Sequence, residues 1–129
     1  IFRANRPIGP LDSVTEIDGA ALEGVVAQHL RAWCDYSNSD HRLHYWQTKT
    51  QTEVDFIVYG ASGLFALEVK NSDRIRREDL KGLKAFGNDY PESQRFLLYR
   101  GQERLLRDGV LCLPCHEFLA ELQPNQFPE

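Results

Sequence analysis

The chain has 129 residues, which is enough for one domain with a substantial core and too few for two. Its hydrophobic fraction of 42% is that of a globular protein, and its formal net charge of −4 excludes a domain that is basic throughout, so nucleic-acid binding would need a local basic patch. It has no apolar run long enough to span a membrane and no signal-peptide pattern.

The first part of the chain predicts a leading segment, a helix and a strand. Residues 1–18 have no clear period and predict a segment that runs over the surface. Asp18 is placed to cap the helix that follows, because apolar side chains then recur at helical spacing: Leu22, Val25, Val26, His29, Leu30 and Trp33. Glu23 lies at the margin of this stripe. Leu43–Gln47 predicts the first strand.

The rest of the chain predicts a hairpin and then further alternating elements. In order, these are a strand at Glu53–Val58, a turn at Gly60–Gly63, a strand at Leu64–Lys70, a helix from about Arg76 to Asp89 that Tyr90 and Pro91 stop, strands at Arg95–Arg100 and Val110–Leu113, and a helix at Cys115–Leu122. This order of a helix, three strands, a helix, one or two strands and a last helix predicts a single α/β domain over residues 19–122. Its mixed central sheet is flanked by helices, and residues 123–129 form a polar, frayed tail.

The hairpin carries charge where its strands should be apolar. A symmetric hairpin that closes on the turn pairs Asp55 with Glu68 and Glu53 with Lys70. Two carboxylates directly opposite each other destabilise a sheet, and a buried unpaired charge costs several kcal/mol. A solvated face with a Glu53–Lys70 ion pair would leave Asp55 against Glu68 unexplained. A divalent cation would reverse the repulsion, so the pattern favours an Mg²⁺-like site at Asp55 and Glu68, with Lys70 beside it.

The arrangement of Asp55 and Glu68-Val69-Lys70 resembles the signature of the PD-(D/E)xK nuclease-like superfamily. An ordered series of segments is also similar to the DUF4143 family, whose members form the C-terminal domain of AAA-type ATPases: Gly19–Glu23, Tyr45–Lys49, Glu53–Phe56, Leu67–Ser72 and Asp79–Leu83. The resemblance implies a restriction-endonuclease-like α-β-β-β-α-β core. It also implies an Mg or Mn site at Asp55 and Glu68, with Lys70 as a catalytic residue and Glu23 as a further acid.

The same resemblance implies that an ATPase region precedes this domain, and the lack of any methionine in a chain that begins at Ile1 agrees with a fragment. No Gly-rich phosphate loop occurs, so ATP is not expected to bind here. Gln47 stands where relatives often have Arg, which removes one expected phosphate contact. Three cysteines are few and odd in number, so a reducing cytoplasm is the expected location.

Two further patterns, a basic stretch and a cysteine motif, each have a functional and a structural explanation. The basic stretch of Arg74, Arg76, Arg77, Lys81 and Lys84 can hold a nucleic-acid backbone, but the acids among them favour a solvated helix face. Cys112-Leu113-Pro114-Cys115-His116 matches haem-attachment and redox patterns literally. Two small buried residues beside a strand-to-helix turn explain it more simply.

Three hypotheses for function remain open from the sequence. The first is a metal-dependent nuclease-like domain that acts on DNA or RNA through Asp55, Glu68 and Lys70. The second is a non-catalytic module of the ATPase that binds a partner or nucleic acid. The third and weakest is a thiol redox protein that uses Cys112 and Cys115.

Overall fold

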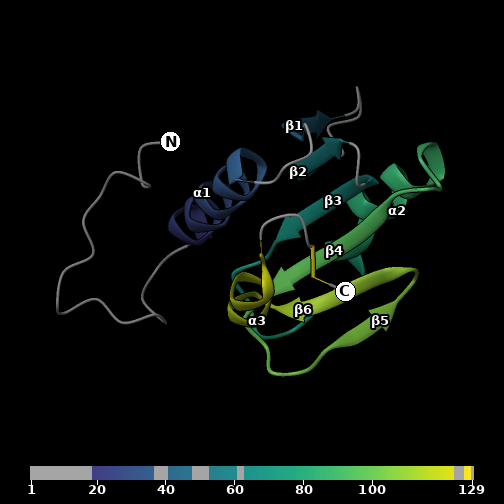
Figure 1. Ribbon diagram of the computed structural model, residues 1–129. Coiled ribbons are helices and arrows are strands. Elements are labelled where there is room, and N and C mark those ends of the chain that lie inside the picture. The colour runs from purple at the N-terminus through teal and green to yellow at the C-terminus, as the bar shows by residue number, and fades with distance from the viewer. Residues whose placement is uncertain (1–18, 37–40, 48–52, 61–62, 124–126, 129) are drawn as a thin grey trace, which may run out of the picture.

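The computed structural model describes residues 19–36, 41–47, 53–60, 63–123 and 127–128. Within them, one mixed sheet has the strand order β1-β2-β3-β4-β6-β5 (Figure 1). The strands are β1 (Arg42–Gln47), β2 (Glu53–Gly60), β3 (Gly63–Val69), β4 (Gln94–Tyr99), β5 (Leu105–Arg107) and β6 (Val110–Pro114). The helices are α1 (Gly19–Tyr36), α2 (Lys81–Asp89), α3 (Cys115–Glu121) and the short 3₁₀ helix η3 (Arg77–Leu80).

The sheet is antiparallel on one side and parallel in its middle. β1, β2 and β3 form an antiparallel meander, β4 and β6 add in parallel, and β5 closes the far edge as the antiparallel partner of β6. The predicted single α/β domain with a mixed sheet is confirmed. The expectation of one or two strands after the second helix is wrong, because the three-residue β5 makes a third; its residues are largely exposed and give no apolar pattern.

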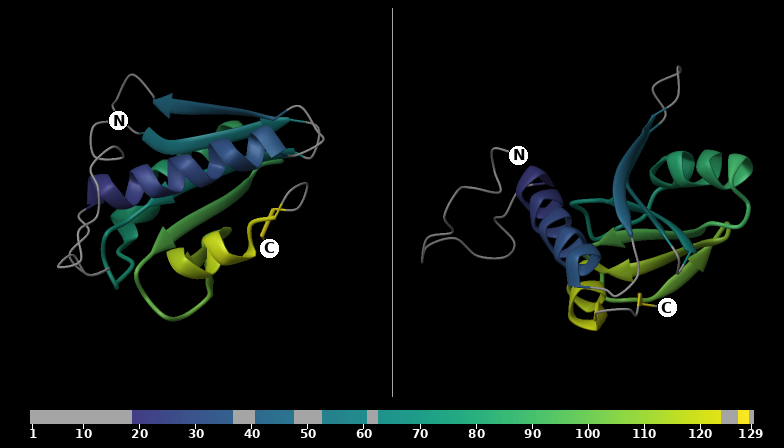
Figure 2. Two further views of the ribbon diagram at one scale, coloured as in Figure 1. Left: turned by 60° about the vertical axis from the view of Figure 1, so that its left-hand side comes forward. Right: turned by 45° about the horizontal axis from the view of Figure 1, so that its top comes forward.

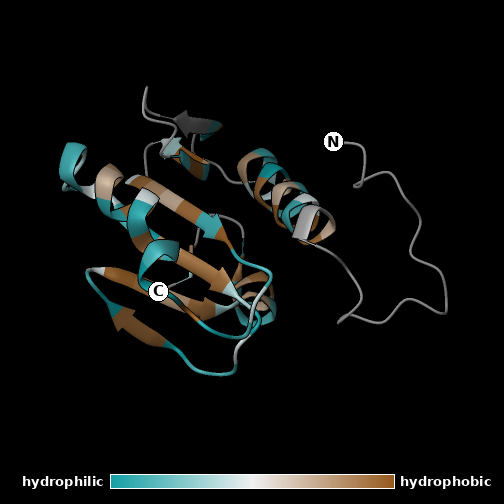
Figure 3. Cartoon of the chain, turned by 180° about the vertical axis from the view of Figure 1, so that it is seen from behind, coloured by the Kyte–Doolittle hydropathy of each residue, from teal (hydrophilic) through white to brown (hydrophobic). Residues whose placement is uncertain are grey.

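The helices cover both faces of the sheet, and each face has its own core (Figure 2). α1 and α3 pack on one face, where the largest fully buried side chains include Phe56, Phe96 and Phe118. α2 packs on the other face through Leu83 and Phe86. The central strands β3, β4 and β6 therefore each contain a run of buried apolar residues, and brown segments mark such runs in Figure 3.

The predicted element boundaries hold to within a few residues, with one exception. The predicted helix from about Arg76 begins instead as η3, and regular α-helix starts only at Lys81. Arg76 is extended, with φ −101° and ψ 158°, so it lies outside the helix. The predicted cap Asp18 lies outside the described residues. None of the described helices is both long enough and apolar enough to cross a membrane.

The predicted frayed tail needs correction, because it contributes to the core. Phe127 is only 9% exposed and stacks on Phe65, with ring centroids 4.2 Å apart. The indole N–H of Trp33 donates a 2.6 Å hydrogen bond to the carbonyl of Gln123, which ties α1 to the end of the chain. One aromatic among polar residues was too weak a signal to predict this packing.

Candidate functional site

The predicted register of the charged hairpin is confirmed. β2 pairs with β3 from Gly60 opposite Gly63 to Phe56 opposite Leu67. One more step along this register brings Asp55 opposite Glu68, and the paired residues end just before that step. The two acids therefore lie where the main-chain ladder of the hairpin stops.

An irregularity on the other side of β2 falls at the same place. The register with β1 passes from His44 opposite Ile57 to Trp46 opposite Val54, so two residues of β2 face one residue of β1. Such a bulge bends the strand and redirects a side chain. It also breaks the predicted alternation along β2, because Val54 and Ile57 pack in the same core cluster.

Side chains replace the missing ladder between the two strands. The backbone N–H of Val69 donates a 2.9 Å hydrogen bond to Oδ2 of Asp55. The backbone N–H of Asp55 donates a 3.3 Å hydrogen bond to Oε1 of Glu68. Each carboxylate is thus held by a backbone group of the facing strand, which fixes the position of both.

The Glu68 carboxyl group has a strongly perturbed pKa. Glu68 is only 7% exposed, and burial raises its pKa to about 9. A side-chain hydrogen bond with Asp55 and the negative charge of Asp55 act in the same direction, whereas the charge of Lys70 opposes them. Near neutral pH, the pair therefore holds a proton on Glu68.

α1 brings a third acid, Glu23, toward Asp55. Glu23 is half-buried, and its pKa is raised by burial first and then by the charges of Asp55 and Glu53. Within the described residues, however, no group of three or more His, Cys, Asp or Glu side chains lies close enough to hold a metal ion. Glu23 is thus a neighbour of the Asp55–Glu68 pair and does not complete a three-residue metal site with it in this conformation.

Lys70 has a different partner from the predicted one. Its Nζ lies 3.9 Å from Oδ1 of Asp79, and among the described residues no ion pair joins it to Glu53. β3 ends at Val69, and the Lys70 N–H donates a 2.8 Å hydrogen bond to the carbonyl of Leu98 on β4. The backbone of Lys70 is therefore bonded to β4 and not to β2. The expected Glu53–Lys70 ion pair is wrong.

Gly82, at which α2 meets the hairpin, was not predicted as a site residue. A Cβ at this position would lie 2.2 Å from the backbone carbonyl oxygen of Glu53 and 3.7 Å from Oε2 of Glu68. Only glycine lets the helix approach the start of β2 this closely. The segment Asp79–Leu83 is one of those that resemble the family. Its residue pattern does not show which of its residues lie close to the carboxylates.

The cysteine motif has no geometry for redox chemistry. Cys112 and Cys115 are both free and buried, and they belong to the core clusters on opposite faces of the sheet. Burial raises the pKa of Cys112 and raises that of Cys115 to about 11. A protonated, inaccessible thiol is a poor nucleophile, so the structural explanation holds.

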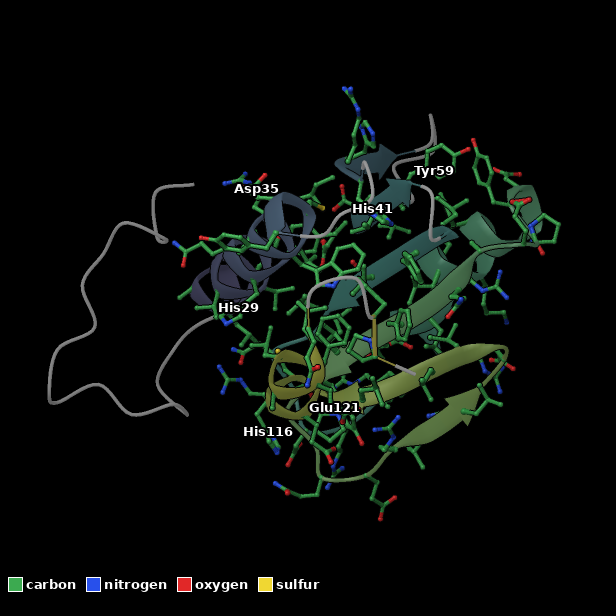
Figure 4. All side chains as sticks on the ribbon, in the orientation of Figure 1. His29, Asp35, His41, Tyr59, His116 and Glu121 are labelled. Atoms are coloured by element: carbon green, nitrogen blue, oxygen red, sulfur yellow. The ribbon has the colours of Figure 1, made fainter. Side chains whose placement is uncertain are left out.

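The other polar and concave features lie apart from the carboxylates. An open depression of about 710 Å³ is lined by Ile57, Leu64, Phe86 and neighbouring residues, none of them a predicted site residue. Tyr59, labelled in Figure 4, also lines it. His29 on α1 and His116 on α3 are exposed, and Figure 4 shows them on separate helices.

All five basic residues of the stretch from Arg74 to Lys84 are exposed. Lys84 lies 3.8 Å from the Asp108 carboxylate, and the Arg107 guanidinium donates to the carbonyl of Ile75, so this surface packs against the β5–β6 turn. Its proposed contact with nucleic acid stays a prediction.

A comparison with protein families finds a match to this chain. The family model described as "Domain of unknown function (DUF4143)" matches residues 18–118. This range covers most of the chain, including α1, the charged hairpin, α2 and the start of α3. No curated protein matches the chain.

Proposed function

We propose that this chain, which belongs to the DUF4143 family of domains of unknown function, is a nuclease-like domain with a metal-dependent phosphodiesterase site. The substrate class is DNA or RNA. One observation carries the proposal: Asp55 and Glu68 are held against each other at the end of a strand ladder, with the lysine ammonium of Lys70 close enough to act on Glu68. Paired carboxylates at such a cost to stability are typical of functional sites.

The donor set fits a small divalent cation. Asp55 uses Oδ2 for the Val69 N–H, and Glu68 uses Oε1 for the Asp55 N–H, so one oxygen of each side chain has no backbone donor. Mg²⁺ is commonly bound by one or two carboxylates, with waters and substrate phosphate as the other ligands. When bound, Mg²⁺ or Mn²⁺ would lower the pKa of a water and offset charge on a phosphoryl group.

The remaining residues have supporting tasks in this proposal. Lys70 places a positive charge beside the carboxylates, where it can orient a water or stabilise negative charge that develops on a phosphate. Glu23 adds an acidic group from α1 that can accept a hydrogen bond from a water at the site. The exposed Arg and Lys residues of η3 and α2 supply contacts to the phosphate backbone of the substrate.

The wider context is part of the same proposal. The order α1, β1, β2, β3, α2, β4 supports a restriction-endonuclease-like core. The family resemblance supports an upstream ATPase region of the same protein and a cytoplasmic location. These assignments predict that the domain acts on nucleic acid that the ATPase region remodels.

Cleavage of labelled DNA and RNA in the presence of Mg²⁺ or Mn²⁺ tests the proposed activity. We expect cleavage by the wild-type domain that a chelator stops and that Asp55→Asn and Lys70→Ala each lower by about a hundredfold. Glu53→Gln is the matched control, because it changes an exposed carboxylate on the same strand. Equal activity in wild type and Lys70→Ala would show that the cleavage comes from a contaminant.

A non-catalytic module of the ATPase is the second candidate. It is favoured by the finding that, in the described part of the chain, the acids form no group of three that could hold a metal ion. A protonated Glu68 paired with Asp55 is then a relic of a site that has lost its chemistry. This candidate predicts nucleic-acid or partner binding without cleavage and without carboxylate-dependent metal binding.

A further inference from the structure

Asp79 lies in η3, which leads into α2, and forms an ion pair with Lys70 of the proposed site. One of its carboxylate oxygens, Oδ1, lies 3.9 Å from the ammonium nitrogen of Lys70. The Asp79 side chain is 16% exposed and that of Lys70 is 37% exposed, so the contact is partly shielded from water. An ion pair with this exposure adds little to stability, and its effect is mainly on where the lysine side chain lies.

The backbone around η3 holds the other oxygen of Asp79 in place. Oδ2 accepts a 2.8 Å hydrogen bond from the N–H of Arg76, and the N–H of Asp79 donates a 3.0 Å hydrogen bond to the carbonyl of Arg76. This reciprocal pair is a capping arrangement that orients the carboxylate. Asp79 is therefore a fixed acceptor, whereas Lys70 has a long and flexible side chain.

Lys70 has two negative regions within its reach. Its charge acts on Glu68, which shares a hydrogen bond with Asp55, and its ammonium nitrogen also lies 3.9 Å from Oδ1 of Asp79. Without Asp79, the carboxylate pair would be the remaining attractor for the ammonium. The lysine would then neutralise the oxygens that the proposed metal ion needs.

We propose that Asp79 is a positioning residue that holds the ammonium of Lys70 beside the Asp55–Glu68 pair and keeps it from collapsing onto these carboxylates. The inference rests on the proposed function for its catalytic consequence. Among the described residues, Asp79 forms no hydrogen bond with Asp55 or Glu68. Its effect on this pair is therefore exerted through Lys70. The placement of Lys70 by Asp79 can be measured without any turnover.

Asp79→Asn separates the two tasks of this side chain. The amide oxygen still accepts the hydrogen bond from Arg76, so the cap is kept, while the negative charge opposite Lys70 is lost. Asp108→Asn is the matched control, because Asp108 forms a similar 3.8 Å ion pair with Lys84 at a distance from the site. Asp108 has a φ of 52°, which asparagine tolerates well, so this control should fold normally.

Two readouts test the proposal. The first is the order parameter of the Lys70 ammonium group from nitrogen-15 relaxation, with Lys84 as the internal reference. We expect Asp79→Asn to change the order of Lys70 alone, because its ammonium moves to the Asp55–Glu68 pair, and Asp108→Asn to lower that of Lys84 alone. The second is cleavage: Asp79→Asn should lower kcat about tenfold with little change in KM, and it should have almost no further effect in a Lys70→Ala background.

The outcomes separate the inference from the proposed function. Unchanged order of Lys70 in Asp79→Asn overturns the inference, as does an equal loss of activity from Asp79→Asn with and without Lys70. If no variant cleaves nucleic acid but the order of Lys70 still depends on Asp79, the positioning contact is supported and the nuclease proposal fails.

Discussion

The backbone N–H of Asp55 donates to the Glu68 carboxylate at 3.3 Å, while the Asp55 carboxylate accepts from the N–H of Val69 on the same strand as Glu68. The two acids thus take over the hydrogen bonding of a strand pair at the point where its backbone ladder ends. This exchange fixes two acidic side chains against each other in a partly buried position. Because the arrangement of these two acids costs free energy, its effect can be measured as a change in the stability of the domain.

The pair should make stability depend on pH. The pKa of Glu68 is about 9 in the folded chain against an ordinary value of 4.5, so the folded state holds a proton that the unfolded chain releases between these values. The free energy of unfolding should therefore fall as the pH rises from about 4.5 to 9 in metal-free buffer. Urea unfolding at pH 5 and pH 8 measures this difference, and Glu68→Gln should remove most of it. Glu92→Gln, which changes an exposed carboxylate, is the control and should keep the difference between pH 5 and pH 8. The same difference in the wild type and both variants would contradict the raised pKa of Glu68.

Substitutions at Asp55 should distinguish its charge from its hydrogen bond. Asp55→Asn keeps an acceptor for the Val69 N–H and removes a negative charge that opposes ionisation of Glu68, so we expect equal or higher stability without metal. Asp55→Ala leaves that N–H without an acceptor and should cost about 1–3 kcal/mol. Urea denaturation at neutral pH compares the two variants. An equal loss of stability in both variants would show that the carboxylate charge, and not its hydrogen bond, stabilises the fold.

Gly82 should tolerate no side chain. Gly82→Ala places a Cβ 2.2 Å from the Glu53 carbonyl, and this backbone atom cannot move aside without shifting β2 against α2. We expect a loss of about 1–3 kcal/mol in unfolding free energy. Gly87→Ala is the matched control on the same helix, because its Cβ meets the mobile end of the Arg95 side chain and alanine favours the helix. Similar stability of both variants would exclude a close approach at Gly82.

The cysteines should behave as core residues. Cys112 and Cys115 are buried on opposite faces of the sheet and their pKa values are raised, so a thiol reagent should modify them slowly in the native protein and rapidly in denaturant. Mild oxidation should not link them. Rapid modification of both thiols in the folded protein, or a disulfide between them, would revive the redox hypothesis.

The sequence predicted the hairpin and its register because the turn at Gly60–Gly63 and the alternation of the flanking residues are local signals. It also predicted that Glu23 lies at the margin of the apolar stripe of α1, where the structure has it half-buried. The bulge at Asp55 could not be predicted, because it depends on how β1 pairs with β2 across a turn. The partner of Lys70 was missed for a similar reason: Asp79 reaches it only through the path of η3. Phe127 was missed because a single aromatic has no periodicity.

Titration calorimetry with Mn²⁺ tests the central claim most directly, namely that Asp55 and Glu68 form a divalent-cation site. The account predicts saturable binding by the wild-type domain at neutral pH, loss of that binding in Asp55→Asn and in Glu68→Gln, and unchanged binding in Glu53→Gln. Absence of Mn²⁺ binding to the wild-type domain, or equal binding in all four proteins, would contradict it.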